Sequence, residues 1–265
     1  MNNNRAQRQA AILNKLREQD RVSPQALAEL FDVSLMTIHR DLKQLDEEGH
    51  ITKLHGGATL THRFAWSDKY RMRSYLQADA KAAIGAFAAR YLINPDEDYL
   101  IIDSGSTTLA FAKALPDTSM NVMVSCLPAL AALSEHQHTR VHSLGGQLNS
   151  DLMAFEGSIA IDTLKSCHFS KAFIGTDGID LNAGFTTVNT ANAQLTRLMT
   201  EQAEQVFVLA DHTKFHQRAF ASIMQFEHIT AVVTDKVAPQ AFRELFQKHN
   251  IQLYEVDSYH ELKTD

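Results

Sequence analysis

Residues 33–42 read VSLMTIHRDL, and this stretch decides the fold of the first part of the chain. Its apolar residues Ile38 and Leu42 are four positions apart and therefore share one side of a helix. Ser34 precedes this apolar pattern and is one of the residues preferred for capping a helix N-terminus. The stretch predicts an amphipathic helix over residues 35–48.

Two more helices are expected before this one. Residues 5–19 carry apolar side chains at helical spacing, and Ser23 followed by Pro24 is typical of the start of a short helix, here running to Phe31. Two helices joined by a turn of three to four residues form the helix-turn-helix pattern. Residues 51–57, ITKLHGG, alternate in polarity and end in two glycines, which predicts a two-stranded wing.

The helix over residues 35–48 has a polar face opposite its apolar one. The N-terminal half of such a helix reaches base edges in the major groove of DNA, where arginine suits bidentate pairing with guanine. Lysine and histidine on a wing suit contacts to phosphate. The expected DNA contacts are Ser34, Met36, Thr37, His39, Arg40, Lys43, Lys53 and His55. The alternative is a three-helix bundle with a merely solvated face, but the ordered succession of cap, turn, glycine stop and wing favours DNA binding.

Charge is unevenly distributed along the 265 residues, whose formal net charge is −6. Residues 1–81 hold 13 Lys and Arg against 10 Asp and Glu, whereas residues 82–265 hold 12 against 21. This asymmetry suggests a small cationic module joined to an acidic one. Hydrophobic residues make up 45% of the chain, which is enough for a packed core.

The sequence has no apolar run of about 18 residues and no apolar segment behind its N-terminus, so neither a transmembrane helix nor a secretory signal is expected. Its two cysteines, Cys126 and Cys167, form no CxxC pair, and its 13 histidines show no convincing metal-ligand spacing. We therefore expect a cytoplasmic protein without membrane contact, bound metal or cofactor.

From Asp79 onward, short apolar strands alternate with helices, which predicts an α/β domain with a mostly parallel sheet. Strands are expected at residues 99–103, 121–125, 141–144, 171–175, 205–210, 229–234 and 252–256, with a further candidate at 219–224. Helices are expected at residues 79–92, 107–115, 128–136, 159–165, 190–202 and 239–248. The expected domains are a DNA-binding domain at 1–60, a linker at 61–78 and an α/β effector-sensing domain at 79–258.

The expected strands end in polar, glycine-rich turns. Residues 103–108, DSGSTT, lead directly into a helix, whose free N–H groups favour phosphate, while glycine lets a ligand approach the backbone closely. Parallel strands gather their carboxyl ends at one edge of a sheet, where ligands bind. The expected ligand contacts are Asp103, Ser104, Gly105, Ser106, Thr107, Thr108, Ser125, Gly145, Gly146, Gly175, Asp177, Asp180, Asp211 and Lys214. Lys214 suits a phosphate and the aspartates suit sugar hydroxyls, although each aspartate can instead cap a turn.

The stretch 33–42, followed by LDEEG at 45–49 and HGGA at 55–58, resembles the DeoR family of bacterial transcriptional regulators. The strand-end segments resemble the C-terminal effector domain of the same family, so the resemblance covers roughly residues 5–256. It implies a ribose-5-phosphate-isomerase-like fold and a phosphorylated sugar or related metabolite as effector. It also implies double-stranded operator DNA as a partner and repression of a carbohydrate-utilisation operon. Because one winged helix gives limited affinity for DNA, a homodimer or tetramer is expected.

The chain departs from the family pattern at several positions. Members usually carry arginine in place of His39, Thr-Asn in place of Ser125-Cys126, and glycine in place of His216. Because histidine titrates near neutral pH, His39 suggests mild pH sensitivity of DNA binding. A glutamate usual near positions 191–192 is also missing.

An isomerase-like fold makes a sugar-phosphate isomerase fused to a DNA-binding module the alternative. Aldose–ketose isomerisation needs a base beside a carbonyl and a second group that stabilises the enediolate. Asp177, Asp180 and Lys214 supply part of this, but no carboxylate stands near positions 191–192. The attached DNA-binding module favours a regulator over an enzyme.

Overall fold

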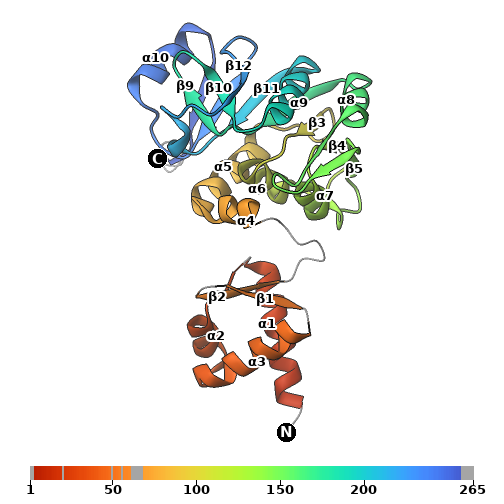
Figure 1. The fold of residues 1–265 in the computed structure, drawn as a ribbon, viewed down its shortest axis with the longest axis vertical. Coiled ribbons are helices and arrows are strands. Elements are labelled where there is room, and N and C mark those ends of the chain that lie inside the picture. Colours follow the sequence, from red (N-terminus) through yellow and green to blue (C-terminus); the bar gives the residue numbers. More distant parts are fainter. Residues whose placement is uncertain (1–2, 20, 49, 55, 61–67, 258–265) are drawn as a thin grey trace. The chain divides into compact units, whose positions relative to one another are not determined.

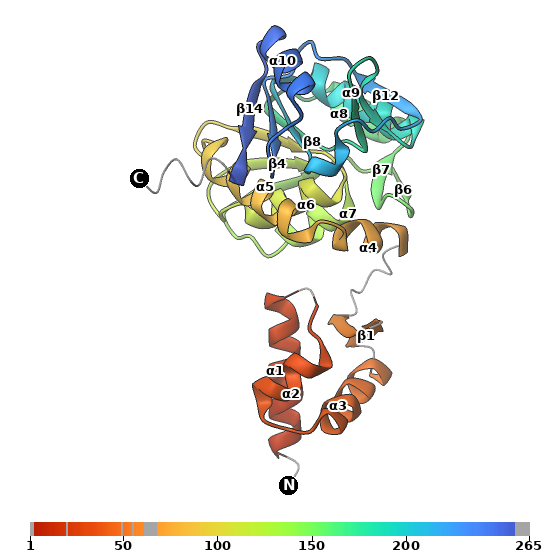
Figure 2. The same ribbon diagram turned by 90° about the vertical axis from the view of Figure 1, so that its left-hand side faces the viewer.

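The structure is a computed structural model that describes residues 3–19, 21–48, 50–54, 56–60 and 68–257. The chain divides into two compact units, Met1–Trp66 and Ser67–Asp265, both drawn in Figures 1 and 2. Each unit is described by itself. The domain boundaries predicted above remain predictions.

The first unit contains a helix-turn-helix followed by a wing. Its helices are α1 (Asn3–Glu18), α2 (Pro24–Phe31) and α3 (Leu35–Glu47), and β1 (Ile51–Leu54) pairs antiparallel with β2 (Gly57–Leu60). The side chain of Ser23 accepts the N–H of Ala26 at 3.1 Å, and that of Ser34 accepts the N–H of Thr37 at 3.2 Å. Both predicted caps are present, and the predicted helix-turn-helix is confirmed.

The three helices and the wing share one small core. Its buried members are Ile12, Leu16, Val22, Leu27, Ile38, Leu42, Leu45, Ile51 and Ala58. A polar link adds to this packing, because the buried carboxylate of Asp41 accepts Arg5 Nε at 3.0 Å and Arg8 Nε at 2.6 Å. The link joins α1 to α3, so it fixes the helix that carries the expected base contacts.

The second unit is built on a seven-stranded sheet in which every neighbouring pair is parallel, with strand order β14-β13-β11-β8-β3-β4-β5. The strands are β3 (Tyr99–Ile102), β4 (Asn121–Val124), β5 (Arg140–Ser143), β8 (Phe169–Ile174), β11 (Ala203–Leu209), β13 (Ala231–Thr234) and β14 (Gln252–Glu255). All seven were expected from the apolar runs, and the predicted α/β fold class is confirmed.

Helices cover both faces of this sheet (Figure 1). One face carries α5 (Ala78–Tyr91), α6 (Ser106–Ala114) and α7 (Leu127–Leu133), and the other carries α8 (Ser158–Lys165), α9 (Thr190–Glu201) and α10 (Gln240–Lys248). Successive side chains of a strand point to opposite faces. Ile102 accordingly packs with Phe111 in one core, whereas Ile101 packs with Met199 in the other.

Two small sheets were only partly anticipated. An antiparallel sheet of order β12-β10-β9 comprises β12 (Ala221–Met224), β10 (Gly184–Thr187) and β9 (Gly178–Asp180). A hairpin pairs β6 (Gln147–Asn149) with β7 (Ala154–Glu156). Of these strands, the sequence indicated only β12.

A helix occupies part of the range expected to be a linker. Helix α4 spans Asp68–Tyr75, and its Tyr70 is fully buried. The sequence shows no apolar periodicity here because a single aromatic side chain anchors the helix. No helix was expected in this range, which the sequence suggested only as a mostly polar connector with aromatic anchors, among them Tyr70. The two other aromatic residues of this range, Phe64 and Trp66, lie outside the described residues.

Strand order reverses direction between β3 and β8. From β3 the chain proceeds to β4 and β5 on one side, and from β8 to β11, β13 and β14 on the other. In open α/β sheets such a switch point leaves a crevice beyond the carboxyl ends of the strands, where ligands bind. The topology therefore predicts a ligand site near Asp103, which follows β3, and Gly175, which follows β8.

Candidate functional site

The outer face of α3 carries the residues expected to contact DNA. Met36, His39 and Arg40 are exposed, and Met36 is 73% exposed despite being apolar. Thr37 is half-buried, and its hydroxyl lies 2.8 Å from that of Ser34. The Ser34 hydroxyl therefore caps the start of the helix, whereas the exposed side chains of Met36, His39 and Arg40 are available to a partner.

The remaining expected DNA contacts lie further along this unit. Lys43 is exposed on α3 and pairs with Glu47 at 3.6 Å across one turn of the helix. Lys53 is exposed on β1. His55, the last expected contact, lies outside the described residues.

A polar pocket opens in the second unit beyond the carboxyl ends of β3, β8 and β11. Of the residues expected to contact a ligand, it brings together Ser104, Gly105, Ser106, Thr107, Gly175, Asp177, Asp211 and Lys214. The remaining lining residues were not expected: Arg73, Leu76, Gln77, Lys81, Leu152, Thr176, Thr187, Asn192 and Thr213. The strand-end turns therefore form the floor of the pocket, and residues around α4 and α5 complete it.

Three other expected residues, Asp103, Thr108 and Ser125, are buried and do not line the pocket. The Thr108 hydroxyl donates to the carbonyl oxygen of Asp103 at 2.7 Å, which secures the turn into α6. The Ser125 hydroxyl has no hydrogen-bond partner among the described residues. These side chains support the pocket wall rather than face its interior.

The expected residues Gly145, Gly146 and Asp180 also lie outside the pocket lining. Gly146 has φ +97°, and a Cβ there would lie 2.6 Å from the carbonyl oxygen of Glu156. The need for glycine at position 146 is therefore explained by close packing of the β6–β7 hairpin. A carboxylate oxygen of Asp180 accepts the N–H groups of Asn182 and Ala183 at 2.9 and 2.8 Å, so this aspartate caps the turn between β9 and β10.

Asp103 ties the two strands of the switch point together. One carboxylate oxygen accepts the N–H of Ser104 at 2.7 Å, and the other accepts the N–H of Gly175 at 3.3 Å and the hydroxyl of Thr196 at 3.2 Å. Complete burial raises the pKa of Asp103 to about 7, against the opposing effect of these hydrogen bonds. Asp103 thus positions the turn that follows β3 and the turn that follows β8.

The N-terminus of α6 opens into the pocket. Gly105 precedes the helix with φ +151°, and Ser106 and Thr107 occupy its first turn, where N–H groups have no partner within a helix. Three basic side chains, Arg73, Lys81 and Lys214, also line the pocket. Aligned peptide dipoles and two ammonium groups together favour an anion.

Lys81 is buried although it carries an ammonium group. The group donates to the carbonyl oxygens of Arg73, at 2.6 Å, and Leu76. Burial lowers the pKa of Lys81 to about 8, an effect that nearby Asp211 opposes. Asp211 itself accepts the N–H and the hydroxyl of Thr213.

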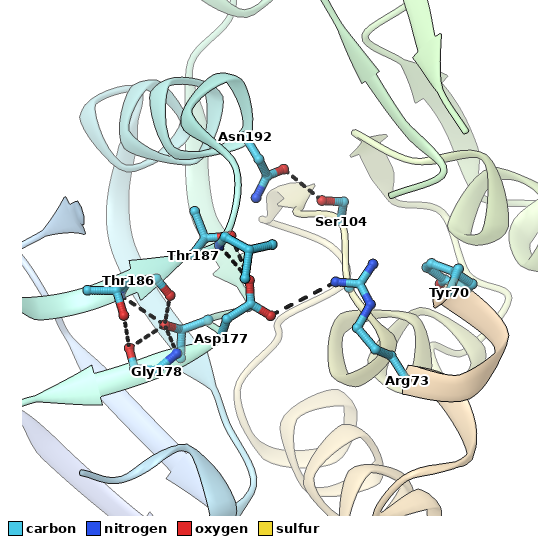
Figure 3. A network of polar contacts seen from close by, with 12 residues as sticks. Tyr70, Arg73, Ser104, Asp177, Gly178, Thr186, Thr187 and Asn192 are labelled. Atoms are coloured by element: carbon cyan, nitrogen blue, oxygen red, sulfur yellow. Dashed lines mark hydrogen bonds and ion pairs between the residues drawn. The ribbon is translucent and has the colours of Figure 1, made fainter. Parts of the chain in front are cut away.

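Two polar contacts cross the pocket, as Figure 3 shows. Arg73 Nη1 on α4 lies 3.9 Å from a carboxylate oxygen of Asp177, and the Ser104 hydroxyl donates to the Asn192 side chain at 2.9 Å. The other oxygen of Asp177 accepts the Thr187 hydroxyl at 2.7 Å. A ligand entering here meets donors and acceptors from both sides.

Sequence reasoning missed Arg73 and Lys81 for a structural reason. Both precede β3, the first strand of the large sheet, and lie outside the strand-end turns, which supplied the expected ligand contacts. The available signal was weak, consisting only of basic residues ahead of and within the first helix predicted for the α/β domain. Asn192 was noted solely because the family usually has a glutamate nearby.

Within the part of the chain that the structure describes, no three His, Cys, Asp or Glu side chains gather closely enough to hold a metal ion. Among the same residues, no helix combines the length and apolarity needed to cross a bilayer.

A helix-turn-helix unit followed by an α/β unit with a polar pocket defines a transcriptional regulator with a sensor domain. Comparison with protein families agrees, because residues 8–64 match the "DeoR-like helix-turn-helix domain" and residues 76–236 match the "DeoR C terminal sensor domain". The chain therefore belongs to the DeoR family of transcriptional regulators.

Individual relatives cover nearly the whole chain. The chain is 31% identical to the "HTH-type transcriptional repressor GlcR" of Bacillus subtilis over 93% of its own length and 95% of that protein. It is 30% identical to the "Putative aga operon transcriptional repressor" of Escherichia coli O157:H7, over 94% and 93%. These relatives are transcriptional regulators, not enzymes, so the isomerase alternative is set aside.

Among solved structures, part of the chain matches ribose 5-phosphate isomerase A from Methanocaldococcus jannaschii. The two chains are 14% identical with a TM-score of 0.39, and the match covers 52% of this chain and 55% of the isomerase. The match thus spans about half of each chain.

Proposed function

We propose that this protein is a repressor of a carbohydrate-utilisation operon whose DNA binding is controlled by a phosphorylated sugar or related metabolite. The observation that carries this proposal is the pocket at the switch point. It places the N-terminus of α6 and the ammonium groups of Lys81 and Lys214 around one space. Family membership supplies the link between such a pocket and transcription.

The pocket offers two kinds of polar recognition. The N–H groups of Ser106 and Thr107, with Lys214, suit the oxygens of a phosphate group. Asp177 and Asn192 suit sugar hydroxyls, because a carboxylate accepts hydrogen bonds and an amide both donates and accepts them. A phosphorylated polyhydroxy compound satisfies both sets at once.

Relatives support the carbohydrate part of this proposal. One is named a repressor of the aga operon and another, from Staphylococcus aureus, the "Lactose phosphotransferase system repressor", which is 30% identical over 88% of this chain. These names describe those proteins. For this chain they favour a sugar-related effector over other anions.

The exposed face of α3 supports the DNA-binding part. Arg40 and His39 are exposed in the half of the helix that reaches base edges, and Lys43 and Lys53 are exposed where phosphates pass. A single winged helix-turn-helix buries little surface on DNA. We therefore propose a homodimer or tetramer that engages two operator half-sites.

The test separates the two binding activities. Fluorescence anisotropy with duplex DNA from upstream of the gene measures DNA affinity, and calorimetry with pentose and hexose phosphates measures effector affinity. Arg40→Ala is expected to weaken DNA binding by about 1–3 kcal/mol without changing effector affinity. Lys214→Ala is expected to weaken effector binding and leave DNA affinity in the absence of effector unchanged.

Lys248→Ala is the matched control, because Lys248 is exposed on α10 and belongs to neither site. It removes one positive charge, as the other two variants do, and is expected to change neither affinity. If the wild-type protein binds no DNA from this region even at low salt, or if Arg40→Ala and Lys214→Ala affect both activities equally, the proposal fails.

A further inference from the structure

Lys81 lies at a junction between the pocket and helix α4. Its side chain is 5% exposed, lines the pocket, and donates to the carbonyl oxygens of Arg73 and Leu76. These carbonyls belong to the last turn of α4 and the residue that follows it, where backbone acceptors have no partner within the helix. Lys81 therefore caps the C-terminal end of α4.

An ammonium group has three N–H donors. In the described part of the chain, Lys81 uses one of them on Arg73 of α4 and one on Leu76, the residue after α4, and no hydrogen bond is found for the third. Burial of a charged group is costly unless its donors are satisfied. An oxyanion in the pocket would take the third donor and neutralise the charge.

Helix α4 touches the pocket at a second point. Arg73 reaches across to Asp177 at 3.9 Å, and buried Tyr70 on the same helix lies beneath the Arg73 guanidinium (Figure 3). In the chain, α4 is also the first described helix after the wing. A change in α4 is therefore a change in the segment that leads from the DNA-binding unit to the sensor.

We propose that Lys81 binds the anionic group of the effector and, because the same ammonium group holds the end of α4, transmits occupancy of the pocket to that helix. The inference rests on the proposed function of the pocket as a site for a phosphorylated ligand. With a ligand bound, the ammonium group is fixed at three points, which are the ligand, Arg73 in the last turn of α4 and Leu76 directly after that helix. The bound anion thereby stabilises the last turn of α4.

Lys214 provides a matched comparison. It lines the same pocket and carries the same charge, but it lies on the short helix His212–Lys214, and no hydrogen bond or ion pair to α4 is found for it among the described residues. Removing either lysine is expected to weaken binding of an anion. Only removal of Lys81 is expected to disconnect α4 from the ligand.

Hydrogen exchange of the peptide that covers α4 tests this in the full-length protein. Inorganic phosphate and ribose 5-phosphate are the probes, each added to saturation as judged by calorimetry. In the wild type, saturation is expected to slow exchange in α4 at least threefold. Lys214→Ala is expected to need more probe but to show the same slowing once saturated, whereas Lys81→Gln is expected to show none.

A second measurement does not depend on how well Lys81→Gln folds. In protein labelled with 13C at lysine Cε, the resonance of Lys81, assigned with Lys81→Arg, is titrated with pH in the presence and absence of phosphate. A bound anion that contacts the ammonium group is expected to move the titration midpoint upward.

The outcomes are distinguishable. If the wild type binds a probe but exchange in α4 is unchanged, if saturated Lys81→Gln slows exchange as the wild type does, or if the Lys81 midpoint does not move, the role of Lys81 is refuted while the pocket stands. If neither probe nor any other sugar phosphate binds the wild type, the proposed effector class and this inference are both overturned.

Discussion

The carboxylate of Asp103 accepts the main-chain N–H of Gly175, at 3.3 Å, across the point where the strand order of the sheet reverses. A further N–H, from Ser104, reaches its other oxygen at 2.7 Å. One buried side chain therefore holds the turns after β3 and β8 in register. These turns form the floor of the pocket, so its shape depends on a buried group that does not line it.

This arrangement predicts that titration of Asp103 makes the free energy of unfolding depend on pH. Burial raises the pKa of Asp103 from 3.8 to about 7, so the folded protein binds a proton there that the unfolded chain releases between these values. The contribution of Asp103 to the free energy of unfolding is therefore present below pH 3.8 and lost as pH rises to about 7. Its slope is about 1.4 kcal/mol per pH unit within that window.

Urea denaturation of wild type and Asp103→Asn between about pH 4.5 and 8.5 measures this contribution. The difference between their free energies of unfolding is expected to change up to pH 7 and to level off above it. Parallel curves across the whole range would show that Asp103 does not titrate in this way.

Asp41 is predicted to be essential for the position of α3. It is 1% exposed and accepts both Arg5 and Arg8, so its removal leaves two guanidinium groups without their shared acceptor. Asp41→Asn is expected to destabilise the first unit by about 2 kcal/mol, less than for a fully buried pair because Arg5 is partly exposed. Faster hydrogen exchange in peptides from α1 and α3 reports the effect.

Asp46→Asn is the control for this prediction. Asp46 lies on the same helix but is exposed, so the substitution removes an equal charge without touching α1. If both variants exchange at the wild-type rate, the link between α1 and α3 does not stabilise the unit.

Gly85 is predicted to be required for the contact between α5 and α6. A Cβ at this position would lie 2.5 Å from the carbonyl carbon of Ala110 and 2.6 Å from the nitrogen of Phe111, both of them backbone atoms of α6. Helix propensity alone would make Gly85→Ala stabilising by about 1 kcal/mol. Overpacking against an immobile backbone outweighs this, so a net loss of about 1–3 kcal/mol is expected.

Thermal unfolding of Gly85→Ala and Ala82→Gly checks the reasoning, because the two substitutions change helix propensity in opposite directions on one helix. Ala82 is exposed, so its replacement is expected to cost about 1 kcal/mol through propensity alone. A Gly85→Ala variant more stable than wild type would mean that α5 and α6 can separate without cost.

Much of the fold was predictable because its determinants are local. Strands such as β8 and β11 end in apolar runs, at residues 172–174 and 206–209, and helix α9, which lies between them in the sequence, has a capping Asn189 and apolar residues at helical spacing. The grouping of Ser106, Gly175 and Asp211 also followed from the sequence, because parallel strands end at a common edge.

The rest depends on tertiary contacts that leave no pattern in the sequence. Lys81 bonds to main-chain carbonyls, so no complementary side chain marks its role. His216 has φ +59°, a conformation favourable to glycine, and its ring packs edge-on against Phe242 at 4.8 Å. Phe242 is 26 residues away from His216 in the sequence, so residues close to His216 could not indicate this contact.

Phosphate affinity is predicted to fall as pH rises through about 8. Burial lowers the pKa of Lys81 to about 8, with Asp211 raising it and Lys214 and Arg73 lowering it further, so the ammonium group loses its proton in an accessible range. A phosphate monoester has its second pKa at about 6 and keeps its double charge across this range. The bound anion prefers protonated Lys81, so the pKa of Lys81 is higher in the complex than in the free protein. The phosphate affinity is therefore fully present below pH 8, falls as pH rises above 8, and stops falling above the pKa of the complex.

Calorimetry with ribose 5-phosphate from about pH 7 to 9.5 measures this decline. Lys214→Ala is expected to bind more weakly but to keep the decline. Lys81→Gln is expected to bind weakly at every pH with no such decline, and a decline as steep as that of the wild type would assign the titration to another group.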